Sequence, residues 1–505
     1  MLRFSVFTEG KPAKKLNLSS AYVVGSEQVP LRAEITFKNG TIVCTKRTAG
    51  PAAIALLWPV EDMGRVLLET TRLQEREAPY VLSVELLRGQ LMRIQHKREE
   101  WGLFDGSLTR TFTEDLKQAG DLLIEGLKAD DPVEAGRAAD RALPLAVRAG
   151  EELSRYHAGL LLERRQQTGG FTRRVFGCQV NLDTSVEECG KYLVDAVDFV
   201  TVPVCWKQIE PTEQNYNFKP IDTWVEWLAA HGIAMKGSAL VAIQEHCVPD
   251  WLYIWEHDFD TIRELVVDHI KRVVSRYSPY IQVWDVISGI HAVQGFSFNF
   301  EQLIELTRLA VTTTKQIAPR SVAVIEVVAP WGEYYARNQR TIPPMLYLEM
   351  AIQSGINFDA CGLQFCFGAG TDGMYVRDMF QISSILERFG SFGKPIHITA
   401  VQVPSGAAVG KGDPKAPALK VTDGGAWHED WNETIQAEWF RDFCTIALSK
   451  PYVDSINWRE LVDPEAPGPH QLPNGGLLRT DSTPKPAYND LVALRKRIVP
   501  GVANG

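Results

Sequence analysis

VFGCQV, residues 175–180, is the first of eight short apolar segments that alternate with amphipathic segments over most of the chain. Short apolar runs bounded by polar residues are typical of buried strands, whereas apolar residues that recur every three or four positions indicate helices. The other strand segments lie at 197–204, 233–240, 281–287, 322–328, 359–365, 395–401 and 453–461. Helical patterns separate them, for example at 261–276, 300–315 and 435–448. Eight strands that each precede a helix predict a (β/α)8 barrel.

A doubly wound α/β sheet is the alternative fold class, because it also alternates strands with helices. Such a sheet commonly carries a glycine-rich phosphate loop, and the sequence contains neither a GxGxxG nor a Walker motif. The barrel is therefore the preferred prediction. In a barrel, the chemistry is expected at the C-terminal ends of the strands and in the loops that follow them.

Residues 1–110 are expected to form a small β-rich, sandwich-like domain. The best local signal is LRAEITFKNGTIVCTK (31–46), where Asn39-Gly40 separates two β-rich runs. A two-residue type I′ hairpin needs positive φ at both turn positions, and these two residue types supply it. Similar strand patterns follow at 52–58 and 65–71. A domain of this kind could bind sugars or could serve only for packing, and the sequence leaves both readings open.

Residues 111–168 are predicted to be a helical linker. Apolar residues at helical spacing follow Thr113, which is the expected N-cap of a first helix. Asp131-Pro132 then places a second N-cap directly before a proline at the first helical position. The barrel itself is expected over residues 171–497.

The composition is that of an ordinary globular protein. The 505 residues are 45% hydrophobic and 23% charged, which excludes a disordered chain. The net charge of −9 argues against nucleic-acid or membrane partners, since both need a basic face. No segment approaches the roughly eighteen apolar residues of a membrane span, and the N-terminus shows no signal-like apolar stretch. The eight cysteines are scattered without CxxC spacing, which with the absent signal favours the cytoplasm.

Several motifs at the expected strand ends resemble those of glycoside hydrolase family 10, the xylanase-type barrels. WKQIEPTEQNYNF (206–218) is similar to the family's KWxxxEPxxGxYNF segment, and SRYSPYIQVWDV (275–286) is similar to its fourth strand. GLQF (362–365), PIHIT (395–399) and LLRTDSTPKPAYNDL (477–491) resemble its sixth strand, its seventh strand and the start of its last helix. The resemblance implies a barrel of that family over 171–497, preceded by a region that it does not cover.

The family resemblance also implies where the catalytic pair should stand. Family members retain anomeric configuration by means of two glutamates, an acid/base in WDVVNE on strand four and a nucleophile in the ITE of strand seven. These positions are Gly289, in WDVISG, and Ala400, in HITA. Neither residue can transfer a proton or attack an anomeric carbon. Neighbouring positions that also differ from the family pattern are Cys205, Ser238, Ser288, Cys366 and Arg459.

Carboxylates elsewhere on the expected catalytic face offer a relocated acid/base pair. The candidates are Glu245 after strand three, Glu326 on strand five, Glu429 in the loop GGAWHEDW (424–431) and Glu460 on strand eight. The alternative for each of them is a solvated charge or an arginine partner, because charged loop residues are usually one or the other.

A thiol or metal site is the other chemical option at the barrel mouth. The side chains that could approach it are Cys205, His246, Cys247, Cys366 and His397. No pair among them has ligand spacing, so no metal is predicted. No cofactor is predicted either.

Aromatic and polar side chains near the strand ends are candidates for ligand contacts, because aromatic rings stack on pyranose faces. The residues expected to contact a ligand are Trp206, Trp331, Gln364, Trp427, Trp458 and Arg459. Trp206 and Trp427 are the preferred stacking residues. The alternative is that tryptophans at these positions pack helices against the barrel.

Three functions are compatible with this sequence. The favoured one is a catalytically impaired barrel, a pseudoglycosidase, that binds a carbohydrate or glycoside in the inherited cleft. The second is an active glycoside hydrolase that uses relocated carboxylates. The third is a non-catalytic scaffold. Fold alone cannot choose among them, because barrels support many functions.

Overall fold

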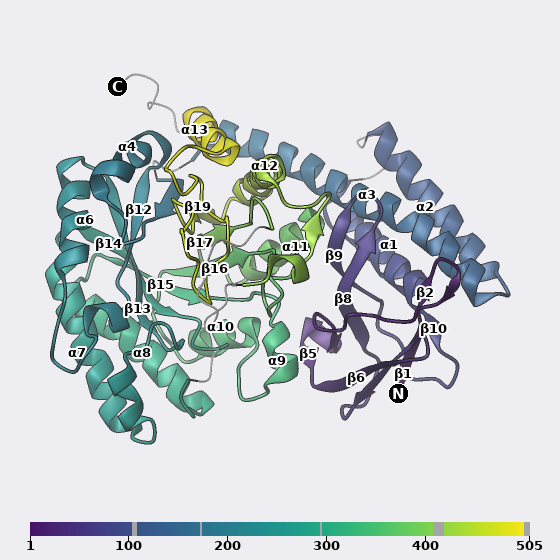
Figure 1. Ribbon diagram of the computed structural model, residues 1–505, viewed down its shortest axis with the longest axis horizontal. Helices are drawn as coiled ribbons and strands as arrows, with labels where there is room; N and C mark the ends of the chain where they lie inside the picture. Colours follow the sequence, from purple (N-terminus) through teal and green to yellow (C-terminus); the bar gives the residue numbers. More distant parts are fainter. Residues whose placement is uncertain (104–108, 172–173, 293–294, 408–418, 499–505) are drawn as a thin grey trace.

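The computed structural model contains a barrel and an N-terminal region that lie side by side, with the long helix α3 (Pro132–Gln167) running along both (Figure 1). The structure describes residues 1–103, 109–171, 174–292, 295–407 and 419–498. No helix within these ranges is both long and apolar enough to cross a membrane.

The barrel is a closed ring of eight parallel strands, as the alternation of apolar and amphipathic segments predicts. Each strand pairs with the next along the chain, and the last closes on the first through the Phe176–Ile456 register. The strands are β11 (Phe176–Gln179), β12 (Phe199–Pro203), β13 (Ala234–Ala242), β14 (Ile281–Ser288), β15 (Val322–Val327), β16 (Ala360–Cys366), β17 (Ile396–Gln402) and β19 (Val453–Trp458). All eight C-terminal ends therefore surround one opening.

A layer of helices covers the outside of the ring (Figure 1). The longer ones are α4 (Val186–Ala196), α6 (Lys219–Ala230), α7 (Phe259–Tyr277), α8 (Phe300–Ile317), α10 (Pro344–Gln353), α11 (Met379–Gly390), α12 (Glu433–Ser449) and α13 (Pro486–Ile498). The chain also contains short helical turns. In the barrel these are α5 (Trp206–Ile209), α9 (Glu333–Arg337) and the 3-10 segments η2 (Asp250–Trp255) and η3 (Val421–Asp423), and in the N-terminal region there is the 3-10 segment η1 (Ser26–Gln28). Because helices cover the outer face, nearly every strand residue is buried.

Local sequence fixes where several of these helices begin. The side chains of Asp258, Asp378 and Asn432 accept hydrogen bonds from main-chain N–H groups in the first turns of α7, α11 and α12. Asn299 and Gln302 form a reciprocal capping box at the start of α8. Each cap satisfies donors that a helix leaves free at its N-terminus, so it ends the preceding loop at a defined residue.

The N-terminal region contains two sheets. The first sheet and one face of the second contribute to the main hydrophobic cluster, whereas the other face of the second sheet forms a separate cluster with Tyr375. The first sheet has the order β10 (Tyr80–Val81), β1 (Leu2–Ser5), β7 (Thr41–Lys46) and β6 (Ala33–Lys38). The second has the order β18 (Ala426–Trp427), β9 (Gly64–Glu69), β8 (Ala53–Val60), β4 (Tyr22–Val24) and β5 (Pro30–Leu31), and β2 (Phe7–Thr8) pairs with β3 (Lys11–Pro12). The predicted hairpin is present, with φ of 51° at Asn39 and 74° at Gly40.

The β-rich part is shorter than expected, because its last strand ends at Val81 and helix α1 (Leu82–Glu100) follows at once. α2 (Arg110–Lys128) begins behind Thr109, which accepts from the Phe112 N–H, so the expected cap at Thr113 is wrong. Asp131 does cap α3 ahead of Pro132, as predicted. The helices pack on one another and on α11 and α12 of the barrel, so they join the two parts as a packed layer.

A buried carboxylate on α3 holds the N-terminal region to the barrel. Glu151, 1% exposed, accepts from the indole N–H of Trp427 at 2.7 Å and lies 2.8 Å from His428 Nε2. It also accepts from the Met379 N–H at 3.2 Å and pairs with Arg155 at 3.0 Å. The same carboxylate thus contacts α3, α11 and the loop that supplies β18. Burial by itself raises the pKa of Glu151, but His428 and Arg155 outweigh burial and lower it.

We expect Glu151→Ala to destabilise the fold by roughly 3 kcal/mol, because it leaves buried donors and a cation without their partner. Urea unfolding would measure this, with the exposed Glu163→Ala on the same helix as a control that changes stability by less than about 0.5 kcal/mol. Since the pKa of Glu151 is lowered in the folded state, its contribution is present above the ordinary carboxyl pKa of 4.5 and is lost as pH falls further. Equal stabilities of the two variants at pH 7 would contradict the assigned role.

Candidate active site at the barrel mouth

A cavity of about 300 Å³ opens at the C-terminal ends of the barrel strands. Its wall is formed by the last residues of β13 to β17 and by the segments that follow β11, β12, β13 and β19. This is the end of the fold at which barrel proteins place their binding and catalytic groups. The volume lies at the lower limit of small-molecule sites, which is roughly 300 Å³.

Neither position of the expected catalytic pair carries a carboxyl group. Ala400 on β17 lines the cavity and is 4% exposed. Gly289 follows Ser288 at the end of β14 and has a φ of +60°, a conformation that favours glycine. A Cβ atom at this position would lie 2.7 Å from Nε2 of Gln244 and 3.2 Å from the side chain of Val328. The backbone at residue 289 is thus shaped for a glycine.

Two of the four alternative carboxylates do line the cavity. Glu326 on β15 is 3% exposed and accepts a hydrogen bond from the Ser288 hydroxyl. Glu460 follows β19 and accepts from Nε2 of Gln402 at 3.1 Å. Burial raises the pKa of Glu460, and the adjacent Arg459 opposes that rise. Both carboxylates therefore face the same enclosed space.

The other two carboxylate candidates lie elsewhere. Glu245 is exposed in the loop after β13, and Glu429 is exposed beside β18, at the contact with the N-terminal region. Neither lines the barrel-mouth cavity. In this structure they are therefore not positioned to act in the cavity, because a catalytic group must reach its substrate.

The tryptophan predictions are wrong for this cavity. The indole N–H of Trp206 donates to Glu210 at 2.8 Å and its ring stacks on His269, while Trp458 is 1% exposed and donates to the Gly475 carbonyl at 3.0 Å. Trp427 is buried against Glu151, and Trp331 lines a different cavity. A position at the end of a strand brings the main chain of a tryptophan close to the barrel mouth. Its long side chain can still point away from the cavity and pack against the outer helices.

The cavity wall is instead rich in side-chain amides that the sequence analysis missed, with the exception of Gln364. They are Gln179, Asn181, Gln208, Gln244, Gln364 and Gln471. Arg459 donates to Oε1 of Gln364 at 3.4 Å and approaches Sγ of Cys366 at 3.9 Å. The rings of His246 and His470 stack with centroids 4.5 Å apart at the edge of the wall. Position was the available signal for four of them: Gln179 and Gln364 lie at or near strand ends, and Asn181 and Gln244 lie two residues beyond one.

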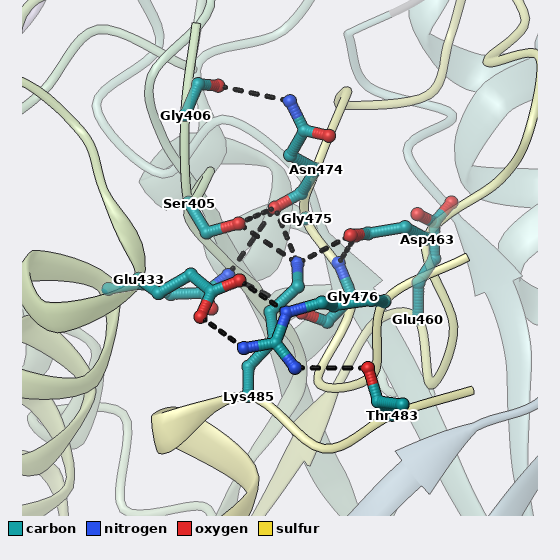
Figure 2. Close-up of polar contacts among 12 residues, drawn as sticks. Ser405, Gly406, Glu433, Glu460, Asp463, Asn474, Gly475, Gly476, Thr483 and Lys485 are labelled. Atoms are coloured by element: carbon teal, nitrogen blue, oxygen red, sulfur yellow. Dashed lines mark hydrogen bonds and ion pairs between the residues drawn. The ribbon is translucent and has the colours of Figure 1, made fainter. Parts of the chain in front are cut away.

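A buried lysine fixes the long segment that follows β19 over the mouth (Figure 2). Nζ of Lys485, a residue 1% exposed, pairs with Asp463 at 2.6 Å and donates to Ser405 Oγ at 2.9 Å and to the Asn474 carbonyl at 3.2 Å. These contacts close the segment from residue 463 to residue 485 into a loop anchored on the chain after β17. Glu460, at its base, and Gln471, within it, are thereby held at the cavity wall.

Polar pairs fill the barrel interior beneath the cavity. Lys236 and Asp285 form an ion pair at 2.8 Å, and both are almost fully buried. Burial raises the pKa of Asp285 to about 6, against the opposing effect of Lys236. His397 contacts Ser455 Oγ at 2.7 Å and does not line the cavity. Each of these polar side chains is paired with another inside the barrel, so the pairs fill the interior beneath the cavity.

Two cysteines lie together on the cavity wall. Sγ of Cys205 is 3.8 Å from the main-chain oxygens of both His246 and Cys247. A hydrogen bond from Cys247 lowers the pKa of Cys205 to about 7, helped by the N–H groups of Gln208 and Lys207, although burial opposes this. The pKa of Cys247 is raised by the same contact. Among the described residues, no three His, Cys, Asp or Glu side chains are arranged to hold a metal ion.

The closed ring of eight parallel strands, with a polar cavity at the strand ends, places the protein among the (β/α)8 barrels. The family model described as glycosyl hydrolase family 10 matches residues 203–494, more than half of the chain. The chain therefore belongs to glycosyl hydrolase family 10.

Relatives of the chain are xylanases at low identity. Endo-1,4-beta-xylanase B of Thermotoga neapolitana is 23% identical over 301 residues, which covers 56% of this chain and 75% of that protein. Endo-1,4-beta-xylanase B of Neocallimastix patriciarum is 24% identical over 198 residues, which covers 37% of this chain but only 21% of that protein. The crystal structure of xylanase 10B from Thermotoga petrophila RKU-1 in complex with xylobiose covers 67% of this chain and 98% of its own, with 19% identity and a TM-score of 0.47.

We expect Cys205 to be the fastest-reacting thiol toward iodoacetamide, with a labelling rate that rises with pH around a midpoint of about 7. The thiolate is the reactive form, so a lowered pKa gives reactivity at neutral pH. Peptide mass mapping after short labelling would identify the site, and Cys205→Ser should remove the fast phase. Cys247→Ser should shift the midpoint upward, because it removes the hydrogen bond that stabilises the thiolate. A midpoint near the free-cysteine value of about 8.5 in the unaltered protein would contradict this prediction.

Proposed function

We propose that the barrel-mouth cavity binds a carbohydrate or glycoside without hydrolysing it. The observation that carries this proposal is the composition of the cavity wall. Both positions of the family's catalytic pair lack a carboxyl group, whereas six amide side chains and Arg459 line the cavity. The reactive groups of the family are gone, and hydrogen-bonding groups suited to hydroxyls are present.

Amides are well matched to sugars because each one both donates and accepts hydrogen bonds. A sugar hydroxyl does the same, so neighbouring hydroxyls can pair with an amide through both of its polar atoms. The contact between Arg459 and Gln364 fixes the amide orientation, since the guanidinium can only donate and Oε1 must accept. The amide N–H₂ of Gln364 is then left to face a ligand.

The backbone conformation at Gly289 supports the absence of the family's acid/base at this position. Its left-handed φ disfavours a glutamate there, and a Cβ would also displace the terminal amide of Gln244, which lies 2.7 Å away. This supports a function that does not use the family's proton donor.

Binding can be tested with a glycan array followed by calorimetry on the best ligand. Gln364→Ala should weaken binding by about 1 kcal/mol, or roughly fivefold, because it removes one ligand hydrogen bond in an enclosed site. Gln353→Ala, an exposed glutamine on α10, is the matched control and should leave the affinity unchanged. The absence of binding to any glycan, or equal effects of the two variants, would overturn the proposal.

Hydrolysis of xylan and aryl xylosides provides a second test. We expect no release of reducing ends above a no-enzyme control, because proton donor and nucleophile are both missing at the family positions. The double variant Gly289→Glu with Ala400→Glu should recover little activity. Its new glutamate at 289 would be strained, and the surrounding shell of Ser238, Ser288, Cys205, Cys366 and Arg459 would not preorganise the pair.

One observation favours an active enzyme as the second candidate function. In the closed strand order, the family's pair would stand on β14 and β17, which are three strands apart. Glu326 on β15 and Glu460 after β19 are also three strands apart, so they repeat the same spacing one strand further round the ring. The raised pKa of Glu460 suits a general acid, and Glu326 would serve as the nucleophile or base.

This second candidate makes a distinct prediction. If the purified protein hydrolyses any glycoside, Glu326→Gln and Glu460→Gln should each lower kcat by several orders of magnitude, whereas the exposed Glu245→Gln and Glu429→Gln should not. Activity that survives both Glu326→Gln and Glu460→Gln would exclude this pair. Activity that depends on them would replace the binding-only proposal.

A further inference from the structure

A second cavity, of about 480 Å³, lies where the N-terminal region meets the barrel. Residues of α1 and α11 line it, and β9, the segment after it and Trp331 after β15 complete the wall. It shares no lining residue with the barrel-mouth cavity. Its volume lies well within the roughly 300–1,000 Å³ of small-molecule sites.

The wall of this second cavity is strongly cationic, although the whole chain carries a net charge of −9. Among the described residues that line it, Glu69 alone is acidic, and the permanent cations are Arg72, Arg93, Lys97, Arg377 and Arg388. Three of the five have carboxylate partners. Arg93 and Arg388 form no ion pair with any described residue; Arg93 donates to the Glu69 carbonyl at 2.8 Å and Arg388 only to the Glu27 carbonyl at 3.5 Å.

Burial makes these cations costly to hold without a counter-ion. It lowers the pKa of both Arg93 and Arg388, since a low-dielectric site disfavours the charged form. In the described part of the chain, Nε of Arg377 and Nη2 of Arg72 are also buried without a hydrogen-bond acceptor, and Arg377 is only 2% exposed. Unpaired cations and unsatisfied donors around one cavity are the groups that a bound anion would satisfy.

Beside the polar Gln28, His96, Gln381 and Ser384, the wall of this cavity has an apolar part. The ring of Trp331 faces the guanidinium of Arg377, with 4.3 Å from the guanidinium carbon to the ring centroid. Phe380, Ile385 and Met92 add further apolar surface. An inorganic anion would leave this surface uncovered, so an organic anion with a planar apolar body fits the wall better.

We propose that the cavity between α1 and α11 is a binding site for a small organic anion, a carboxylate or phosphate ester attached to an aromatic group. Its negative group pairs with Arg93 and Arg388 and accepts from the unsatisfied donors of Arg72 and Arg377. Its ring lies against Trp331. Because the site spans both parts of the molecule, ligand binding also stabilises their contact. The proposal is independent of what the barrel mouth binds.

Calorimetry with four probes tests the proposal and separates the two anion types. The probes are 1-naphthoate, 1-naphthyl phosphate, 1-naphthalenemethanol and inorganic phosphate. We expect one or both aromatic anions to bind at least about tenfold more tightly than the neutral naphthyl alcohol and than inorganic phosphate, and the tighter of the two identifies the preferred anionic group. Equal binding of the neutral alcohol, or no aromatic anion binding below about 1 mM, would overturn the proposal.

A matched pair of surface variants locates the bound anion. His96 and Gln95 are both exposed on α1, but only His96 lines the cavity. His96→Glu should weaken binding of the aromatic anion severalfold by repulsion, while Gln95→Glu adds the same carboxylate one residue away and should have little effect. Neither change touches a buried contact, so both proteins should fold.

Removal of a cation provides the second line of evidence. Arg388→Gln removes the charge but leaves a polar side chain, and it should weaken binding of the aromatic anion about tenfold or more, whereas the exposed Arg340→Gln should not change it. Thermal unfolding without ligand would establish that both variants are folded. Unchanged affinity in Arg388→Gln and His96→Glu would show that the anion binds elsewhere and would refute the site.

Discussion

The pairing of β19 with β11 is the contact on which the rest of the barrel depends. Through the register of Phe176 with Ile456, it closes eight parallel strands into a ring, so that no strand edge is left open. Closure also brings strand ends that are up to 280 residues apart in sequence to one opening, as with Gln179 and Trp458. Every group discussed at the mouth owes its position to that ring.

The ring explains how residues at the barrel mouth can change while the fold persists. Barrel strands are held by main-chain hydrogen bonds and by the helices outside, so side chains at the strand ends can change without loss of the fold. Gly289 and Ala400 stand where carboxylates are expected, yet the cavity persists and amides line it. Buried pairs such as Lys236 with Asp285 keep the interior filled beneath it.

The N-terminal region is integrated with the barrel, and polar contacts join the two. Glu151 contacts Trp427, His428 and Met379. In addition, the two residues of β18, which belong to a loop of the barrel, pair with β9 in the second sheet of the N-terminal region. The loop that the sequence offered as a catalytic feature therefore lies at the contact with the N-terminal region. Where the two parts meet less closely, Arg93 and Arg388 are left without carboxylate partners around a cavity.

Local sequence alone determined the elements of this protein. The eight apolar segments correspond to β11 through β17 and β19, and Asn39-Gly40 and Asp131-Pro132 correspond to a hairpin turn and a helix start. These features depend on residues near one another in the chain. The spacing of apolar residues, the residue types at turns and the capping residues therefore reveal them. The start of α1 at Leu82 was missed because no cap marks it: Val81 has no side-chain acceptor.

Tertiary structure alone decided which side chains meet. Glu326 and Glu460 share the cavity while Glu245 and Glu429 do not, although all four were expected at the catalytic face of the barrel. Trp206, Trp427 and Trp458 lie near the mouth in sequence but are buried by packing with His269, Glu151 and Phe440. The sequence determines where each strand ends and which residue stands at that end. The direction and depth of its side chain depend on neighbours contributed by distant segments, and only the folded chain brings those neighbours together.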